Sequence, residues 1–437
     1  MMSSSPTSFA VEVSVNSNST IKNEAVKDEV IRILQGGAYS NILDGPIDFS
    51  SSKLLQEHVI SISITGLRDS GIESIAFWQC ELPIYVYRLV SGGAEREVID
   101  GEGDNDDVAA FDQWILPSEE LEGLWESIIL DHPIKSQLLE YSNSAMLFSQ
   151  KMVSKAIISW NKVLLMHGPP GTGKTSICKA LAHKLSIRLS DRYPTSQLIE
   201  INAHSLFSKW FSESGKLVGR LFSHISELAD DDECLLCILI DEVESLAAAR
   251  NISGSEPTDA MRVVNAVLTQ LDSLKSRDNV LVLATSNISK AIDLAFIDRA
   301  DVKIYIGLPG KEARYAIFHS CLRELMRKGI IIPHVEMPSF DTVNLDLSDF
   351  GIYSQLLVNK AVGQKKGENF DSISIGHDKL TKAIELAEGL SGRALRKLPF
   401  LAHAFFIHSS CVDLKTYNDA LLKAVQAEIE RREQLLN

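Results

Sequence analysis

Hydrophobic and polar residues alternate with a period of two in three short runs of the first ninety residues. The runs are Phe9–Val15, Ile60–Ile64 and Ile84–Tyr87, and a helical pattern near Ala25–Leu34 separates the first two. Alternation with this period is typical of strands that bury one face. The pattern predicts a small α+β domain over residues 1–90.

Beyond residue 115 the pattern changes to continuous apolar runs, each followed by a helical pattern. The runs are Val163–Met166, Leu198–Ile201, Leu236–Ile240 and Val280–Ala284. Strands that are apolar on both sides are typical of a parallel sheet covered by helices on both faces. The Gly-, Ala- and acid-rich residues 91–115 between the two regions are interpreted as a solvated acidic linker.

Composition narrows the class of protein and of partner. The 437 residues are 45% hydrophobic and 23% charged, which is the range of soluble globular domains. A net charge of -15 without a long basic run disfavours direct binding to nucleic acid. No apolar run approaches the ~20 residues of a membrane helix, and no secretory leader is visible. We therefore expect an intracellular protein that contacts neither nucleic acid nor membrane.

The six cysteines are scattered, as expected for reduced thiols in the cytosol or nucleus. Cys234 and Cys237 form a CxxC pair, but no second pair of ligands lies at zinc-site spacing. Both fall at the start of a predicted buried strand. We interpret them as packing residues.

The strongest chemical signal is a phosphate-binding loop between the first of these strands and a helix over Ser176–Leu185. The loop reads Gly168-Pro169-Pro170-Gly171-Thr172-Gly173-Lys174-Thr175. Its glycines allow backbone N–H groups to surround phosphates, and the helix N-terminus adds partial positive charge. Lys174 is predicted to contact the β- and γ-phosphates of ATP, and Thr175 to bind Mg²⁺.

Two later strands end in residues that complete such a site. The apolar run Leu236–Ile240 ends in Asp241 and Glu242, and the run that follows leads to Asn287. Asp241 is predicted to bind Mg²⁺, and Glu242 to activate the attacking water. The Asn287 amide can orient that water against the γ-phosphate. Because the carboxyl ends of parallel strands share one edge of a sheet, these residues should lie together.

With these strand ends in place, the chain resembles AAA+ ATPases, and within them the pachytene-checkpoint ATPases. The motifs that carry this closer resemblance are Leu124–Ile129, Lys209–Lys216, Asp298–Asp301 with Tyr305–Gly307, and Gly389–Pro399. The resemblance implies an α/β AAA+ module with a parallel five-stranded sheet flanked by helices over 116–310. It also implies a helical lid over 311–437 and an N-terminal domain that binds substrate or adaptor.

The resemblance also implies an activity and partners. Members of this family are homohexamers that remodel HORMA-domain proteins in meiosis and in the spindle checkpoint, with help from a HORMA-type adaptor. We accordingly expect ATP-driven partial unfolding of a HORMA substrate engaged in a central pore, in the nucleus and cytoplasm. The polar segment 329–379 within the lid receives no assignment.

Several residue roles rest on the resemblance. Arg299 is implied to be the arginine finger that reaches the ATP of a neighbouring subunit, with a local ion pair as the alternative. Arg393 is implied to be the lid arginine at the γ-phosphate, and Arg396 and Lys397 lie close enough to compete for that role. Trp210 and Phe211 are implied to grip substrate in the pore, and residues 250–259 resemble a second pore loop.

Two other functions remain open at this point. Microtubule-severing AAA proteins also form single rings, but they usually present basic pore loops, whereas Trp210 is followed here by Phe211, Ser212 and Glu213. A nucleotide-gated scaffold that never hydrolyses ATP is the second alternative. It has no need of Glu242, Asn287 and Arg299.

Overall fold

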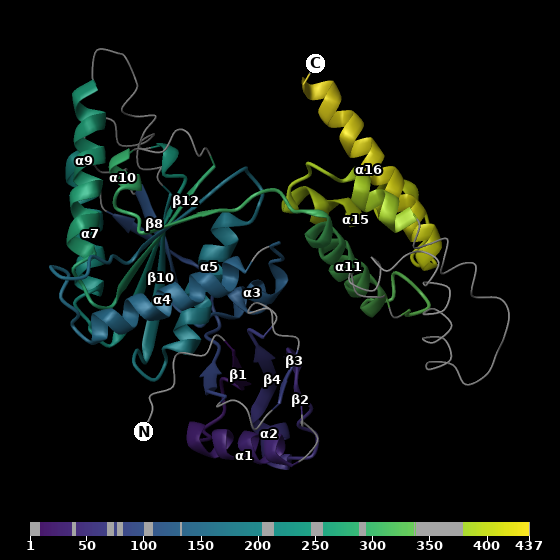
Figure 1. Ribbon diagram of the computed structural model, residues 1–437, viewed down its shortest axis with the longest axis horizontal. Helices are drawn as coiled ribbons and strands as arrows, with labels where there is room; N and C mark the ends of the chain where they lie inside the picture. Colours follow the sequence, from purple (N-terminus) through teal and green to yellow (C-terminus); the bar gives the residue numbers. More distant parts are fainter. Residues whose placement is uncertain are drawn as a thin grey trace. The chain divides into compact units, whose positions relative to one another are not determined.

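The computed structural model describes residues 9–36, 41–67, 74–76, 82–99, 108–131, 133–202, 214–245, 257–287, 294–335, 337 and 379–436. Their contacts divide the chain into two units (Figure 1). One unit comprises Met1–Ile128, His132–Gly168 and Lys174–Ile306, and the other comprises Ile129–Asp131, Pro169–Gly173 and Gly307–Asn437. Within the described ranges, no helix has the length and apolar character needed to cross a membrane.

The N-terminal part of the first unit is the small α+β domain that the alternating pattern predicts. Its elements are β1 (Ala10–Val15), α1 (Asn23–Gln35), β2 (Asn41–Ile42), β3 (Gly45–Pro46), α2 (Lys53–His58), β4 (Val59–Thr65), β5 (Ile75–Ala76) and β6 (Ile84–Arg88). Four strands form a sheet in the order β3-β4-β1-β6, and β2 pairs with β5 separately. One face of this sheet buries apolar residues against α1, including Val13 and Val30.

The remainder of the first unit is built on a seven-stranded sheet in the order β13-β9-β12-β11-β10-β8-β7. Its strands are β7 (Glu95–Ile99), β8 (Val108–Leu116), β9 (Val163–His167), β10 (Thr195–Asn202), β11 (Cys234–Asp241), β12 (Val280–Ser286) and β13 (Val302–Tyr305). Strands β13, β9, β12, β11 and β10 are mutually parallel. The predicted five-stranded parallel sheet is therefore confirmed, and two antiparallel strands extend it.

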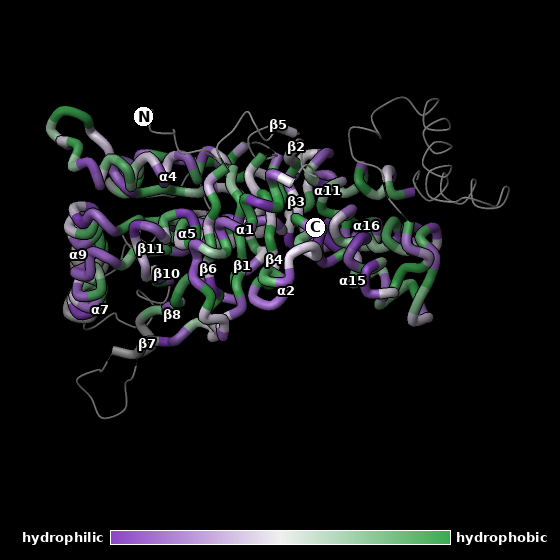
Figure 2. The backbone as a smooth tube through the Cα atoms, turned by 90° about the horizontal axis from the view of Figure 1, so that it is seen from below, coloured by the Kyte–Doolittle hydropathy of each residue, from purple (hydrophilic) through white to green (hydrophobic). Residues whose placement is uncertain are grey.

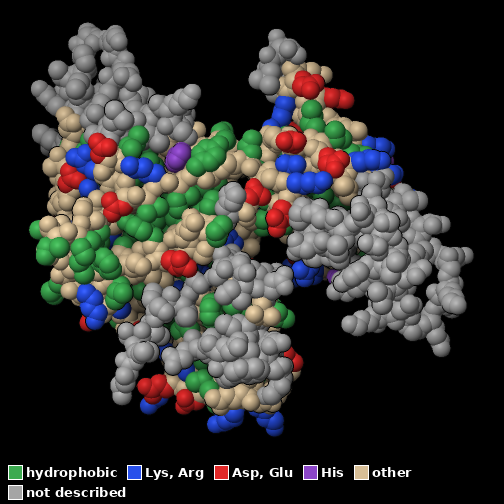
Figure 3. Space-filling view, in the orientation of Figure 1, with side chains coloured by type: hydrophobic (Ala, Val, Ile, Leu, Met, Phe, Trp, Pro, Cys, Tyr) green, Lys and Arg blue, Asp and Glu red, His purple; other side chains and the backbone are tan. Residues whose placement is uncertain are grey.

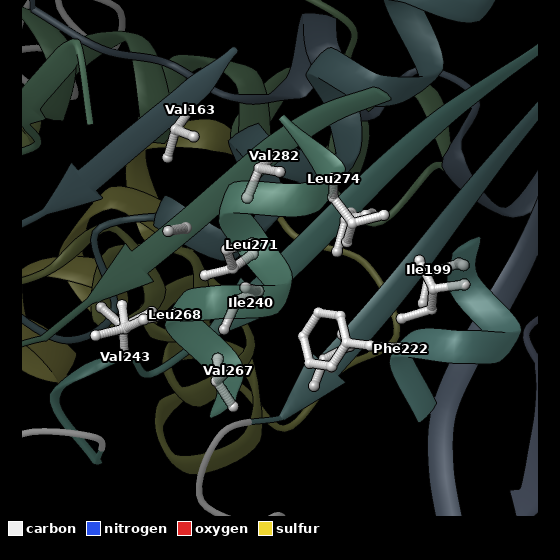
Figure 4. Packing of buried hydrophobic residues seen from close by; sticks show 14 of the residues in the cluster. Val163, Ile199, Phe222, Ile240, Val243, Val267, Leu268, Leu271, Leu274 and Val282 are labelled. Carbon is white, nitrogen blue, oxygen red and sulfur yellow. The ribbon is translucent and has the colours of Figure 1, made fainter. Parts of the chain in front are cut away.

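Helices cover both faces of the large sheet. They are α3 (Leu124–Ser127), α4 (Ile134–Gln150), α5 (Lys174–Arg188), α7 (Ser214–Leu228), α9 (Pro257–Leu274) and α10 (Leu294–Ile297), with a short 3₁₀ helix η3 at Glu119–Leu121. α7 and α9 are amphipathic, so both hydropathy colours appear along them in Figure 2. Their apolar sides pack on alternate residues of the strands, as for Phe222 and Leu271 near Ile240 (Figure 4).

The intervening strand residues, such as Leu239 and Leu283, are also buried, because α5 lies against the other face. Burial on both faces explains why these strands are continuous apolar runs rather than alternating ones.

Strands β7 and β8 correct the interpretation of residues 91–115 as a linker. β8 pairs with β10 from Asp112 to Leu116, and β7 pairs with β8. Trp114 is buried, and the Lys179 ammonium lies 4.4 Å from its ring centre. The strand was missed because the acidic residues before it dominate the local composition, although seven of the nine residues of β8 are apolar.

A cluster of buried charges ties the N-terminal sheet to α5. Glu12 on β1 accepts hydrogen bonds from Lys184 at 2.7 Å and from Arg188 at 2.8 Å, and all three side chains are almost fully buried. Lys184 also pairs with Glu126 at 2.7 Å, and Arg188 donates to the Thr65 hydroxyl at 3.0 Å. The helix that follows the phosphate loop is thus fixed to the N-terminal domain.

The second unit is a helical bundle. Its long helices are α11 (Lys311–Arg327), α15 (Gly392–Phe406) and α16 (Leu414–Leu436), and residues 379–386 are also helical. Leu421 and Val425 of α16 are fully buried, and Ile429 packs against the same core. The last helix of the chain as described thus contributes an apolar face to the core of the second unit. Most of the segment 329–379 lies outside the described residues.

Candidate functional site

The phosphate loop begins directly after β9 and ends as α5 begins at Lys174. Gly168, Gly171 and Gly173 have positive φ values of 146°, 75° and 97°. Residues other than glycine rarely adopt this region, so these positions need glycine to form the loop. A Cβ on Gly173 would meet nothing within 4 Å, which leaves the backbone open to a ligand.

Gly168 is also constrained by its surroundings. Its N–H donates to the Ser286 carbonyl at 3.2 Å, and a Cβ at this position would lie 2.1 Å from the Ile306 carbonyl oxygen. The first glycine of the loop thus lets the strand ends of β12 and β13 approach it.

Lys174 is a buried cation at the start of α5. Its ammonium donates a hydrogen bond to the Gly168 carbonyl at 3.0 Å, which places the charge beside the loop. Burial, and then the nearby Lys174 charge, lower the pKa of His167 at the end of β9. The loop and the adjoining helix end therefore favour an anion.

Asp241 is linked to the phosphate loop through Thr175. The Thr175 hydroxyl donates to the Asp241 carboxylate at 2.9 Å, so the two predicted magnesium ligands are neighbours. Sequence reasoning missed Thr285, whose hydroxyl donates to the same carboxylate oxygen. That hydroxyl also accepts from the Glu242 N–H at 3.2 Å. Thr285 therefore aligns both acids at the end of β11.

Glu242 has an unusual backbone conformation, with φ at 60°. Non-glycine residues with positive φ are rare and cluster at functional sites. The Asn287 amide donates to the Glu242 carboxylate at 3.5 Å, and the Asn287 N–H donates to Glu244 at 3.0 Å. The predicted water-activating acid and its amide partner are thus adjacent. Glu244, which sequence reasoning did not identify, fixes the backbone at Asn287.

Arg299 lies at the amino-terminal ends of the parallel strands, whereas this group lies at their carboxyl ends. It precedes β13, where Val302 pairs with Leu164 and Tyr305 pairs with His167 in parallel. The phosphate loop follows His167, so it is separated from the start of β13 by about 13 Å along the strands.

The Arg299 guanidinium is held on the same side as the start of β13. Its Nε lies 3.0 Å from Asp272 Oδ1, and its Nη2 lies 2.8 Å from Asp272 Oδ2, on α9. This contact lowers the pKa of Asp272. The local ion pair considered for Arg299 exists, with Asp272 rather than with its sequence neighbours. Arg299 does not belong to the phosphate site of its own chain.

Arg393 belongs to the second unit together with the loop tip Pro169–Gly173. Its N–H donates to the Gly171 carbonyl at 3.0 Å. It lies in the first turn of α15, where Ser391 caps the helix by accepting from Ala394 N at 3.4 Å. A Cβ on Gly171 would lie 3.3 Å from Arg393 Cβ. This contact places the backbone of Arg393 beside the loop, and the role of its side chain as the lid arginine stays a prediction.

Trp210 and Phe211 lie outside the described residues, as does most of the segment 250–259. Cys234 and Cys237 are buried in β11, and burial raises the pKa of Cys237 to about 12. No cluster of three potential metal ligands was found in the described part of the chain. The burial of both thiols agrees with the interpretation of this pair as packing residues.

The residues present fit a nucleotide with its magnesium ion. Three positive-φ glycines shape a loop that ends at a buried lysine, and the Thr175 hydroxyl and Asp241 carboxylate supply oxygen ligands of the kind that Mg²⁺ prefers. The Glu242 carboxylate and the Asn287 amide lie beside these ligands. This arrangement can bind a phosphate chain and direct a water molecule at it.

Comparison with known proteins gives matches along almost the whole chain. The family model for the ATPase family associated with various cellular activities (AAA) matches residues 164–308. The models for the TRIP13 N-terminal domain and the TRIP13-like AAA+ ATPase lid C-terminal domain match residues 4–92 and 310–429.

Individual relatives are similar over the same extent. The pachytene checkpoint protein 2 homolog of Oryza sativa subsp. indica is 46% identical over 425 residues, 96% of this chain and 87% of that protein. The homolog of Rattus norvegicus is 45% identical over 431 residues, covering 97% and 94%. The solved structure of C. elegans PCH-2 has a TM-score of 0.74 and 33% identity, and the match covers 97% of this chain and 99% of that one.

Proposed function

Because this chain belongs to the pachytene checkpoint protein 2 family of AAA ATPases, we propose that it is an ATP-hydrolysing homohexamer that partially unfolds HORMA-domain proteins. The observation that carries the proposal is the separation of Arg299 from the phosphate loop of its own chain. The phosphate site contains the other groups proposed for hydrolysis, but Arg299 of the same chain lies at the opposite ends of the strands. A neighbouring copy would supply the arginine and complete the site.

In the proposed site the phosphate loop binds ATP, and Lys174 neutralises charge on the β- and γ-phosphates. Thr175 and Asp241 would hold Mg²⁺, which supplies further charge neutralisation on the phosphate oxygens. Glu242 accepts a proton from the attacking water, and the Asn287 amide orients that water. Arg393 would approach from the lid, because its helix begins beside Gly171.

Across the subunit boundary, Arg299 of one copy would stabilise the charge that develops on the γ-phosphate held by the next. Hydrolysis would then move the pore residues Trp210 and Phe211, which grip an extended stretch of the HORMA substrate. A HORMA-type adaptor would be recognised by the N-terminal domain. Remodelling of HORMA substrates in meiosis or in the spindle checkpoint would take place in the nucleus and cytoplasm.

Mixed rings test the shared site. Glu242→Gln chains lack the base but retain Arg299, whereas Arg299→Ala chains lack the finger but retain the base. Mixing them should restore part of the ATPase activity, because some interfaces then combine one intact half from each chain. A mixture that forms mixed hexamers, shown by mass, but stays inactive would exclude Arg299 as a finger acting between subunits.

A conversion assay tests the substrate. The wild-type protein with ATP should convert a closed HORMA protein to its open conformer, and Trp210→Ala should block conversion while basal ATP hydrolysis persists. Normal conversion by Trp210→Ala would exclude threading and favour a nucleotide-gated scaffold. Activity on microtubules without activity on HORMA proteins would favour a severing enzyme.

A further inference from the structure

Residues 151–160, in the connection between α4 and β9, carry the two most exposed large hydrophobic side chains that the structure describes. Met152 is 85% exposed and Ile157 is 84% exposed, and Ile158 beside it is 48% exposed. On the face shown in Figure 3, hydrophobic side chains form several groups among charged and polar ones. Single exposed apolar residues need no explanation, whereas several within one short segment indicate a contact surface. We call residues 151–160 the α4–β9 loop.

The backbone of this loop is held by hydrogen bonds while its apolar side chains point outward. Met152 N–H donates to the Ser149 carbonyl at 3.0 Å, and the N–H groups of Ile157 and Ile158 donate to the Ser154 carbonyl at 3.1 and 3.0 Å. Met152 has a φ of 51°, a conformation that is uncommon for a side chain of this size. The exposure is therefore a property of a fixed turn.

Lys155 and Trp160 anchor the loop to the body of the domain. The Lys155 ammonium lies 5.0 Å from the centre of the Trp160 ring and donates to the Lys275 carbonyl at 3.1 Å, just beyond α9. Trp160 packs edge-on against Phe148 of α4, with ring centres 5.9 Å apart. The loop thus presents its apolar side chains from a rigid base.

The same contacts place the loop beside Arg299. The Lys275 ammonium lies 2.8 Å from Asp272, the carboxylate that holds the Arg299 guanidinium. Asn161, which follows the loop, donates to Asp301 through its side-chain amide at 2.9 Å. The α4–β9 loop and Arg299 therefore lie together at the amino-terminal ends of the strands, away from the phosphate loop at the carboxyl ends.

We propose that the α4–β9 loop is the surface on which a second copy of this chain docks next to Arg299. The proposal rests on the proposed function, in which Arg299 acts on the nucleotide of another copy. That copy must cover the surface at the amino-terminal ends of the strands, which carries Arg299. The α4–β9 loop contributes exposed apolar side chains to this surface. Met152 and Ile157 lose their exposure to water when the copy docks.

The test is Ile157→Ser in the full-length protein, with Ile60→Ser as the matched control. Ile60 is 60% exposed on β4 of the N-terminal domain, far from the loop in the sequence. The mass of the assembly is measured over a dilution series with ATP, in a Glu242→Gln background that prevents turnover. The midpoint of assembly should rise roughly 10–100-fold for Ile157→Ser, the loss expected for one buried isoleucine. Ile60→Ser and the conservative Ile157→Leu should assemble as the parent does.

A second readout separates docking from catalysis. With Glu242 restored, the ATPase activity per chain of Ile157→Ser should be low in dilute solution and recover at high protein concentration. Assembly of Ile157→Ser at the parent's midpoint overturns the proposal, and so does a variant that assembles normally but no longer binds the HORMA substrate. If assembly weakens as expected but mixed Arg299→Ala and Glu242→Gln rings stay inactive, the docking surface stands and the finger role fails.

Discussion

Glu12→Gln should loosen the N-terminal domain from α5, because it removes a carboxylate that pairs with both Lys184 and Arg188. The substitution preserves the shape of the side chain but leaves Lys184 and Arg188, two buried cations, without the carboxylate they share. Among the described residues Lys184 then keeps Glu126, whose side chain is 50% exposed, and Arg188 keeps the Thr65 hydroxyl and the Tyr85 ring. Breaking a buried ion pair by removing one partner typically costs about 3–5 kcal/mol. We expect a loss within that range in the free energy of local opening.

Hydrogen exchange of the β1 amides measures this opening without requiring a single unfolding transition for the whole chain. The opening equilibrium of β1 should rise at least ~100-fold in Glu12→Gln. Glu57→Gln, which changes an exposed carboxylate of α2, should leave exchange nearly unchanged. Replacing the cluster with apolar residues, Glu12→Leu with Lys184→Met and Arg188→Leu, should recover most of the protection, since uncompensated charge is then absent.

Acid should act in the same direction as the substitution. Burial alone would raise the pKa of Glu12, but Lys184 and Arg188 outweigh it and hold the pKa below its ordinary value of 4.5. The carboxylate therefore contributes stability above that value, and the contribution is lost as pH falls through the lower folded-state pKa. If β1 exchange in Glu12→Gln differed from wild type by less than about threefold, the cluster would not hold the domains together.

Four further variants test the site and its surroundings. Glu242→Gln should retain ATP binding and lower turnover at least ~100-fold, and Thr285→Val, which removes the hydroxyl that aligns Glu242, should lower turnover roughly tenfold in a steady-state ATPase assay. Gly168→Ala should abolish nucleotide binding by calorimetry, because its Cβ would lie 2.1 Å from the Ile306 carbonyl oxygen. Burial, and then the Lys184 charge, lower the pKa of His183 to about 4. The free energy of unfolding should therefore fall as pH drops from about 6.5 toward 4. His183→Gln should flatten that pH dependence in denaturant titrations.

The phosphate site was predictable because its signals are local. The loop from Gly168 to Thr175 is contiguous, Asp241 directly follows an apolar run, and Asn287 lies three residues beyond the end of the next one. Parallel strands bring their carboxyl ends to one edge, so spacing along the chain becomes proximity in space. The contact between Thr175 and Asp241, 66 residues apart, follows from that rule.

The residues that were missed depend on contacts that carry no local signal. Glu12 reads as one polar position of an alternating strand, yet its partner Lys184 lies 172 residues away. Asp272 is one acid on an amphipathic helix until the fold brings Arg299 against it. Thr285 looks like an ordinary strand residue, because only the tertiary structure shows which acids its hydroxyl meets.

The buried cluster at Glu12 also bears on how the chain is made. β1 finds its strand partners early, since β6 ends at Arg88. The cations that neutralise Glu12 are synthesised about 100 residues later, which takes roughly 5–20 s at typical rates of translation. During that interval the carboxylate faces water on an otherwise formed sheet. Neutralisation of Glu12 therefore waits for α5, the helix that begins at Lys174, so the N-terminal sheet is completed only when part of the following domain has been made.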